Sequence, residues 1–376
     1  MGIGELPDAA DYGDAGSFTL GHVADANGGL HLPNLQRFGI GNIAPIKGVE
    51  PCQSPVASFG KLQEASKGKD STTGHWELGG LQVSYDFSYF YDGFPEAMMQ
   101  RFMELTGVHG YLGNKAASGT EIIKELGEEH VKTGFPIVYT SADSVFQIAA
   151  HEEVIPLTRL YEICRITREE LLVSPLMVGR VIARPFVGEP GNFTRTVNRK
   201  DYSLDPHDKT ILDLCYDAGI PTVAIGKIND LFNHRGIRIK SNTKSNSAGC
   251  DALAEHLGRQ RDSLIFVNLV DFDVYFGHRN DPTGFAKALE YFDQRLADIT
   301  GAMDSTDHLV ITADHGNDPT TPGTDHTREY VPLLYYTPGK TGEPLGIRST
   351  FADVGKTAAD FFGLQNRLFG KSFLKV

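Results

Sequence analysis

Two short apolar segments of this chain each end in aspartate and histidine residues. The runs Leu264–Val270 and Leu309–Thr312 are apolar and rich in β-branched residues, which is typical of buried strands. In open α/β sheets, ligands bind at the carboxyl edge, where such strands end. The ligand candidates at this edge are Asp273 and His278 after the first run, and Asp314, His315 and His326 after the second.

Carboxylates and imidazoles together form a ligand set that suits zinc or manganese better than calcium, which takes oxygen ligands alone. Five such side chains are too many for one tetrahedral ion. We therefore expect a cluster of two metal ions, and clusters of this kind clamp phosphoryl oxygens. The alternative is that these residues are solvated loop residues that follow strands. That explanation is the commoner one for any single histidine, but it accounts poorly for all five.

Strands alternate with helical patterns along most of the chain, which predicts an α/β fold. Helices are expected where apolar residues share one face, over Phe285–Met303 and Phe351–Phe362. A length of 376 residues is enough for two domains. We expect a core domain from residues 1–86 and 205–376, with a smaller cap domain, residues 87–204, inserted into it. In the cap we expect strands at Pro136–Thr140 and Met177–Ala183, and helices at Gly119–Leu126 and Ser144–Glu152.

The composition is that of an acidic enzyme. The net charge is −13 and no run of Lys or Arg is present, so a nucleic acid is not an expected partner. The four cysteines have neither pair nor metal spacing, so we expect reduced thiols. No apolar stretch approaches the roughly 18 residues of a membrane span, and no signal peptide is evident. These features predict a cytoplasmic protein with no membrane contact and no obligate protein partner.

A nucleophile is needed if the metals activate phosphoryl transfer, and the segment Gly68–Glu77 supplies adjacent hydroxyls at Ser71, Thr72 and Thr73. A metal that binds a hydroxyl favours the alkoxide and replaces a general base. Taken alone, such a segment is more often a Ser/Thr-rich turn or helix cap.

Over nearly its full length the chain resembles the phosphopentomutases of the alkaline phosphatase superfamily. The segments that carry this resemblance are Gly2–Ala9, Gly21-His22, Gly68–Glu77, Tyr139–Val145, Gly179–Phe186, Gly191–Thr196, Val270–Asp273, Gly277–Arg279 and the block from Asp314 to His326.

The resemblance implies an alkaline-phosphatase-like core sheet with helices on both faces and an inserted α/β cap. It implies interconversion of ribose 1-phosphate and ribose 5-phosphate, and of the 2-deoxy sugars, in nucleoside salvage and catabolism. Two Mn²⁺ ions are implied, one held by Asp273, His278 and His326, the other by Asp314 and His315. Ser71 would carry the phosphate, although family members more often have Thr there. The implied route passes through a pentose bisphosphate, and a hexose bisphosphate such as glucose 1,6-bisphosphate primes the enzyme.

Substrate contacts are implied in the same way for six residues. They are Ser141, Asp143, Arg180, Ile182, Arg195 and Lys227. Arginine suits bidentate phosphate binding. The alternative for each cap arginine is a surface ion pair.

Family members begin with an apolar strand that ends in Asp-Ser, just before the residues that match Gly2-Ile3-Gly4, and that Asp completes the second metal site. We therefore expect the true start to lie upstream of Met1, and a chain without this strand to hold the second ion weakly and to be impaired.

Two other functions fit the same residues. One is a metal-dependent phosphohydrolase of the same superfamily. The other is a catalytically impaired form that binds sugar phosphates.

Overall fold

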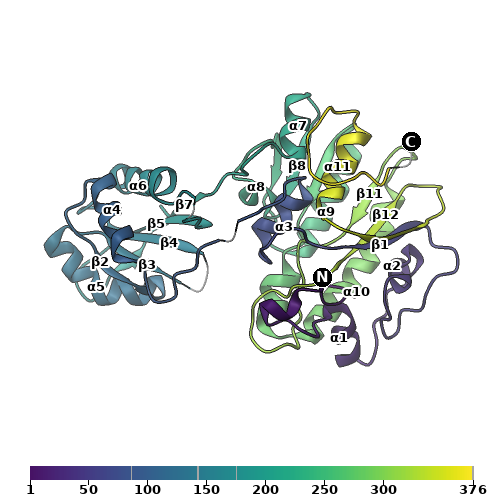
Figure 1. Ribbon diagram of the computed structural model, residues 1–376, viewed down its shortest axis with the longest axis horizontal. Coiled ribbons are helices and arrows are strands. Elements are labelled where there is room, and N and C mark those ends of the chain that lie inside the picture. The colour runs from purple at the N-terminus through teal and green to yellow at the C-terminus, as the bar shows by residue number, and fades with distance from the viewer. Residues whose placement is uncertain (86, 142–143, 175, 375–376) are drawn as a thin grey trace. The chain divides into compact units, whose positions relative to one another are not determined.

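The computed structural model describes residues 1–376 except residues 86, 142–143, 175 and 375–376. The chain divides into two compact units (Figure 1), which we call the core and the cap. The core comprises Met1–Ser84 and Pro206–Val376, and the cap comprises Tyr85–Asp205. The core is therefore built from two separate stretches of sequence, whereas the cap is one contiguous segment.

The described core strands form two sheets. These strands are β1 (Ala57–Leu62), β8 (Thr222–Ile225), β9 (Ile239–Ser241), β10 (Leu264–Val267), β11 (Leu309–Ile311), β12 (Val331–Tyr336) and β13 (Pro344–Arg348). One sheet has the order β11-β12-β1-β13, and the other has the order β10-β8-β9 with all its strands parallel. In the first sheet β1 pairs antiparallel with β12, with Phe59 opposite Leu334, and parallel with β13. Strands β10 and β11 are therefore edge strands of different sheets.

Helices pack against both core sheets. They are α1 (Thr19–Ala26), α2 (Pro33–Phe38), α3 (Ser71–Leu78), α7 (Ile211–Asp217), α8 (Ile228–Leu231), α9 (Asn246–Arg259), α10 (Pro282–Gly301) and α11 (Ala352–Phe361), with short 3-10 or π turns at Ala9–Tyr12, Ile40–Asn42, Phe272–Phe276 and Gly277–Arg279. Helices α1, α2 and α10 share an apolar cluster in which Leu20, Leu35 and Leu289 are fully buried. Each such leucine contributes about 1.5–3 kcal/mol of burial.

The cap is a mixed sheet covered by helices on both faces (Figure 1). Its elements are α4 (Glu96–Thr106), β2 (Leu112–Ala116), α5 (Gly119–Thr133), β3 (Ile137–Thr140), β4 (Val145–His151), α6 (Leu157–Ile166), a π turn at Thr167–Leu171, β5 (Arg180–Val187), β6 (Thr194–Arg195) and β7 (Lys200–Ser203). The strand order is β2-β3-β4-β5-β6, and β7 pairs with β5. Helix α5 covers Tyr139 and Phe186, whereas α4 and α6 cover Phe146 on the opposite face.

The helix predicted over Ser144–Glu152 is wrong. The segment forms strand β4, which pairs with β3 on one side and β5 on the other. All seven of its residues, Val145–His151, are buried. A strand buried on both faces does not alternate polar and apolar residues, so sequence alone does not distinguish it from a buried helix.

The other predicted helices are confirmed with shifted ends. Helix α10 begins three residues before Phe285 because the Asp281 side chain caps it by accepting from the Gly284 N–H, and Pro282 occupies the first turn. Helix α5 continues past Leu126 to Thr133 and ends at Gly134, whose backbone is left-handed. Strand β5 begins at Arg180 rather than Met177 and extends to Val187.

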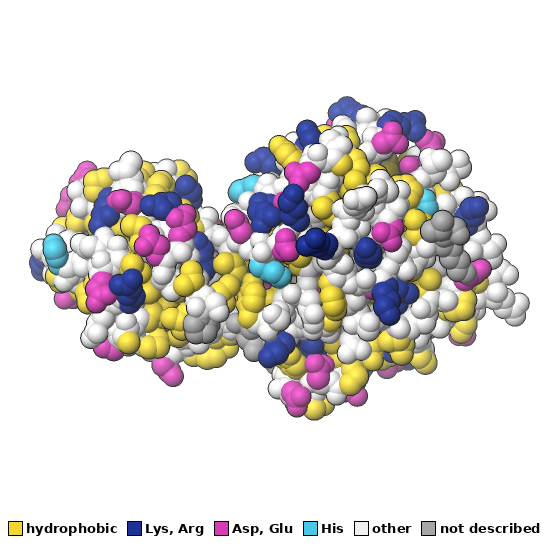
Figure 2. Space-filling view, turned by 45° about the horizontal axis from the view of Figure 1, so that its top comes forward, with side chains coloured by type: hydrophobic (Ala, Val, Ile, Leu, Met, Phe, Trp, Pro, Cys, Tyr) yellow, Lys and Arg dark blue, Asp and Glu magenta, His cyan; other side chains and the backbone are white. Residues whose placement is uncertain are grey.

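Basic and acidic side chains are interspersed over the visible surface of both units (Figure 2). All four cysteines are unpaired. Among the described residues, no helix combines the length and the apolar character needed to cross a bilayer.

Candidate metal centre and nucleophile

Ser71 is the first residue of helix α3, and the Asp70 side chain fixes this start. The Asp70 carboxylate accepts from the backbone N–H groups of Thr72 and Thr73, as a helix N-cap does. It also accepts from the Thr73 hydroxyl at 2.6 Å. The Ser71 Oγ instead lies 3.0 Å from Nε2 of His315. Of the three adjacent hydroxyls, Ser71 is thus the one in contact with a candidate metal ligand, and the Thr73 hydroxyl is already engaged.

Asp273, His278 and His326 converge on one point. Their ligand atoms lie within 4.8 Å of one another. Each imidazole Nε2 is 3.2 Å from an Asp273 carboxylate oxygen. Nδ1 of His278 contacts the Thr324 carbonyl at 2.6 Å, which fixes the tautomer that turns Nε2 toward Asp273. Nε2 of His326 is buried and has no well-aligned hydrogen-bond partner within the described chain. This carboxylate and these two imidazoles fit a divalent cation such as zinc or manganese.

Asp314 and His315 form a second group beside the first. The Asp314 carboxylate lies 3.2 Å from Nε2 of His315 and 3.1 Å from Nδ1 of His75. The His315 and His326 rings stack with their centroids 3.7 Å apart, so the two groups adjoin. The structure therefore brings together all five residues that the sequence suggested as ligands.

Two residues of the centre were missed by the sequence analysis. His75 lies one helical turn after Ser71, and its Nδ1 also contacts the Ser71 carbonyl at 2.8 Å. The spacing of four on a helix was the available signal. Asn317 donates from its side chain to Asp273. Its position three residues after Asp314 carried no such signal.

The charges of the centre favour a bound cation. Burial alone would raise the pKa of Asp314, but the imidazoles of His315 and His75 hold it well below its usual range. Asp273 behaves likewise, because the imidazoles of His278 and His326, each 3.2 Å away, outweigh its burial and lower its pKa. Burial, and then the charge of His315, lower the pKa of His326, which favours the neutral imidazole that binds metals.

Close backbone approach explains one glycine of the nucleophile segment. A Cβ at Gly74 would lie 2.0 Å from the carbonyl oxygen of Asp314. Helix α3 can therefore lie against the segment that carries Asp314 and His315 only because residue 74 has no side chain. This contact sets the separation between Ser71 and His315.

The amino-terminal segment is tied to the same loop. The buried Glu329 carboxylate accepts from the backbone and the hydroxyl of Thr19, at 2.9 and 2.6 Å. His22 contacts Asp318 at 2.6 Å. These contacts attach the segment that contains Gly21 and His22 to the loop that follows Asp314 and His315.

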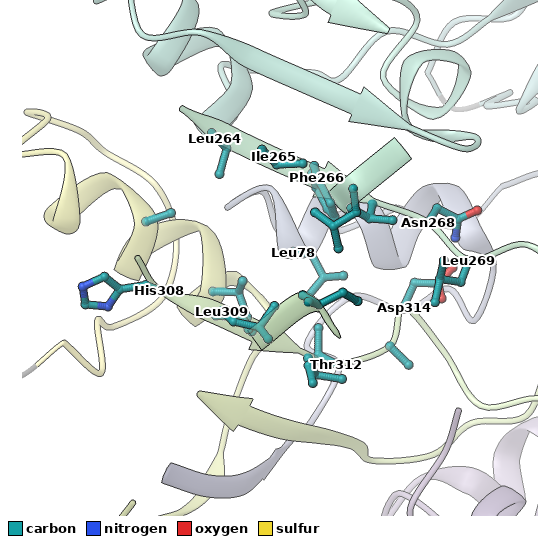
Figure 3. A pocket seen from close by; sticks show the side chains of 18 of the residues that line it. Leu78, Leu264, Ile265, Phe266, Asn268, Leu269, His308, Leu309, Thr312 and Asp314 are labelled. Atoms are coloured by element: carbon teal, nitrogen blue, oxygen red, sulfur yellow. The ribbon is translucent and has the colours of Figure 1, made fainter. Parts of the chain in front are cut away.

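An apolar cavity of about 720 Å³ leads away from the centre between β10 and β11 (Figure 3). Leu264 and Phe266 of β10 line one side, and Leu309 of β11 lines the other. Asp314 lies at one end and His308 at the opposite end. Burying a charged phosphate among such side chains is unfavourable, so a sugar phosphate would bind outside this cavity.

The residues predicted to contact substrate lie in both units. Lys227 immediately precedes α8 in the core. In the cap, Ser141 follows β3, Arg180 and Ile182 lie two residues apart on β5, and Arg195 ends β6. Asp143 lies outside the described residues.

A model of the metalloenzyme superfamily matches residues 1–366 of the chain. The phosphopentomutase of Dictyoglomus thermophilum is 56% identical over 377 residues, covering 100% of this chain and 96% of the relative. The phosphopentomutase of Caldanaerobacter subterraneus subsp. tengcongensis is 54% identical over 376 residues, with 100% and 95% covered.

Among solved structures, the phosphoglycerate mutase of Leishmania mexicana aligns with a TM-score of 0.50 at 12% identity, covering 100% of this chain and 96% of that enzyme. At this identity the likeness concerns the fold alone.

Proposed function

Because this chain belongs to the phosphopentomutases of the metalloenzyme superfamily, and is thus an isomerase that depends on a divalent metal, we propose that it interconverts ribose 1-phosphate and ribose 5-phosphate and their 2-deoxy equivalents. The observation that carries the proposal is the 3.0 Å contact between Ser71 Oγ and His315 Nε2, at the start of a helix and beside two sets of metal ligands. This arrangement suits a serine that accepts and returns a phosphate.

The proposed metals are two manganese ions. Asp273, His278 and His326 would hold one, and Asp314 and His315 would contribute to the other. Bound ions of this kind neutralise phosphoryl oxygens and favour the serine alkoxide.

Ser71 is proposed to carry the phosphate that is transferred. A hydroxyl of the pentose phosphate attacks the phosphorus, a new P–O bond forms, and the bond to Ser71 Oγ breaks. The resulting pentose bisphosphate returns its other phosphate to Ser71, so the enzyme is regenerated and no phosphate is consumed. A hexose bisphosphate such as glucose 1,6-bisphosphate would load Ser71 for the first cycle.

The remaining site residues are proposed to position the sugar phosphate. Arg180, Arg195 and Lys227 would hold the distal phosphate and the sugar, and Ser141, Asp143 and Ile182 would contact the sugar. We propose a cytoplasmic location and a role in nucleoside salvage, for which the unpaired cysteines give support.

The test is conversion of ribose 1-phosphate in the presence of Mn²⁺, with and without glucose 1,6-bisphosphate. We expect ribose 5-phosphate to form, faster with the bisphosphate, and mass spectrometry to locate a phosphate on Ser71. A Ser71→Ala variant should lose both signals. Release of free phosphate would instead indicate a phosphohydrolase, and binding without turnover would indicate a sugar-phosphate-binding protein.

A further inference from the structure

A buried amide connects the two groups of candidate metal ligands. Asn317 lies two residues after His315, but its side-chain Nδ2 donates to the carboxylate of Asp273, which belongs to the other group. Asn317 is only 2% exposed. A Cβ at Gly277 would lie 2.3 Å from Cγ of Asn317, so the amide fits against this segment because residue 277 has no side chain. The loop that carries His315 therefore contacts a ligand of the other group through one side chain.

This amide matters most to Asp273 when an ion is bound. The polar contacts of the carboxylate within the described chain come from Nδ2 of Asn317 and from Nε2 of His278 and His326, each Nε2 being 3.2 Å away. An imidazole nitrogen that binds a cation uses its lone pair for the cation and offers no proton to a carboxylate. Within the part of the chain that the structure describes, the amide of Asn317 then remains as the hydrogen-bond donor to Asp273. Partners of this kind fix the orientation of a ligating carboxylate.

The backbone of Asn317 is held in turn by a buried hydroxyl and a buried carboxylate. Its N–H donates to Oγ1 of Thr19 at 3.1 Å, and this hydroxyl donates to Oε1 of Glu329 at 2.6 Å. The hydroxyl of Thr327 also donates to Oε1, at 2.6 Å, which helps to fix the carboxylate. Thr19 is fully buried and Glu329 is 2% exposed. A continuous series of hydrogen bonds therefore runs from Glu329 through Thr19 and Asn317 to Asp273.

We propose that Asn317 is a positioning residue for the metal ligand Asp273, and that Thr19 and Glu329 act through it. Their role rests on the proposed function, in which Asp273 holds an ion, and extends it to residues that are not ligands. Helix α1, which begins at Thr19, thereby contributes to metal affinity without supplying a ligand. Loss of the Thr19 hydroxyl should weaken metal binding only because it releases Asn317.

The experiment measures equilibrium binding of Mn²⁺ to the full chain by calorimetry, without substrate. An Asp273→Asn variant identifies the binding step that depends on this carboxylate, and every Kd refers to that step. Asn317→Ala should raise this Kd about tenfold, as expected when a ligand loses the partner that orients it. The matched control is Asn34→Ala, which removes another amide that donates to a carboxylate, that of Asp293 at 3.1 Å, between α2 and α10. The control should leave the Kd unchanged.

Two variants of Thr19 separate the role of its hydroxyl from that of its packing. Thr19→Val keeps the shape and removes the hydroxyl, so the Kd should rise about threefold, as expected for one lost hydrogen bond. Thr19→Ser keeps the hydroxyl and should retain the parent Kd even where its Tm is lower. The double variant Thr19→Val, Asn317→Ala should bind Mn²⁺ as Asn317→Ala does, because both changes act along one path. If Asn317→Ala does not fold, the comparison of Thr19→Val with Thr19→Ser decides.

A Kd for Asn317→Ala within twofold of the parent, or equal Kd values for Thr19→Val and Thr19→Ser, would overturn the proposal. So would a double variant whose Kd rises by the product of the single effects, about thirtyfold, because Thr19 would then act independently of Asn317. If Asp273→Asn binds Mn²⁺ as the parent does, the proposed ligand set fails, and the positioning role fails with it. Mutase activity of the unaltered chain is assayed separately, so loss of the positioning role alone leaves the proposed function standing.

Discussion

Replacing Arg328 with methionine should strongly destabilise the core. The Arg328 side chain is only 4% exposed, and its partner Glu64 is 3% exposed. Nη1 of Arg328 donates to Glu64 at 2.8 Å and to the Gly68 carbonyl at 2.7 Å, and Nη2 donates to Asp8 at 3.1 Å. Methionine preserves the apolar stem but leaves the Glu64 carboxyl buried without a cation.

Removing one partner of a buried ion pair costs about 3–5 kcal/mol. That is a large share of the roughly 5–15 kcal/mol that stabilises a typical protein. For a unit of this size each kcal/mol lowers the Tm by about 2–4 °C, so we expect a decrease of about 10 °C. Mutase activity should fall as well, because the Gly68 carbonyl in the segment before Ser71 loses its donor.

The destabilisation should depend on pH in a defined direction. Burial, and then repulsion from Glu77, raise the pKa of Glu64 well above its usual 4.5, while Arg328 opposes the shift. Without Arg328 the folded-state pKa rises further. A raised pKa contributes stability that is fully present below the unfolded value and is lost as the pH rises through the folded value. The Tm difference between parent and variant should therefore be small at about pH 5 and larger at about pH 8.

The assay is thermal unfolding followed by circular dichroism across this pH range. The matched control is the double variant Glu64→Gln, Arg328→Met, in which residue 64 carries no charge, so it should regain part of the lost stability. A Tm difference that is the same at every pH, or a double variant less stable than Arg328→Met, would refute the assignment of the loss to an unpaired carboxylate.

Three further predictions concern the metal centre. His326→Ala should abolish activity and weaken Mn²⁺ binding at least tenfold, as measured by calorimetry, because it removes one of three converging ligands; tight binding in this variant would remove His326 from the metal site. The hydrogen bond to Asp273 raises the pKa of His278, so Mn²⁺ must compete with a proton for this imidazole. The affinity for Mn²⁺ should therefore fall as the pH decreases, and the fall should start at a higher pH than for an ordinary imidazole. A Kd for Mn²⁺ that does not depend on pH would contradict this. Gly74→Ala should cost about 1–3 kcal/mol and lower activity, because the added Cβ forces α3 away from Asp314; a Tm equal to that of the parent would show that the helix adapts freely.

The ligand positions were predictable because strand and ligand are neighbours in sequence. β-branched runs indicated β10 and β11, and the side chains beyond the two strands do come together, although the strands are edges of different sheets rather than neighbours in one. Their distribution over two adjoining groups does not follow from position along the chain by the strand argument, because His326, which comes after the second run, joins Asp273 and His278. His75 and Asn317 were missed because each acts through tertiary contact, and neither follows a strand directly.

The error at Ser144–Glu152 has a different origin. The segment contains Gln147, Ala149 and Ala150, which favour helix locally, but its pairing with β3 and β5 decides the outcome. Pairing partners as distant as Arg180 are invisible to a local pattern.

The discontinuity of the core determines the order in which the chain can fold during synthesis. Strand β1 cannot form its antiparallel pairing until β12 has been synthesised, because Ala57 pairs with Tyr336, which leaves the ribosome much later. Every cap strand that the structure describes pairs within Tyr85–Asp205, and the apolar clusters described for the cap draw only on residues of that segment. The cap can therefore fold while the first core segment is still unpaired, since domains generally fold as units during synthesis. Translation that stops before β12 would leave a folded cap attached to an exposed β1, a product prone to aggregation and a substrate for chaperones and proteases.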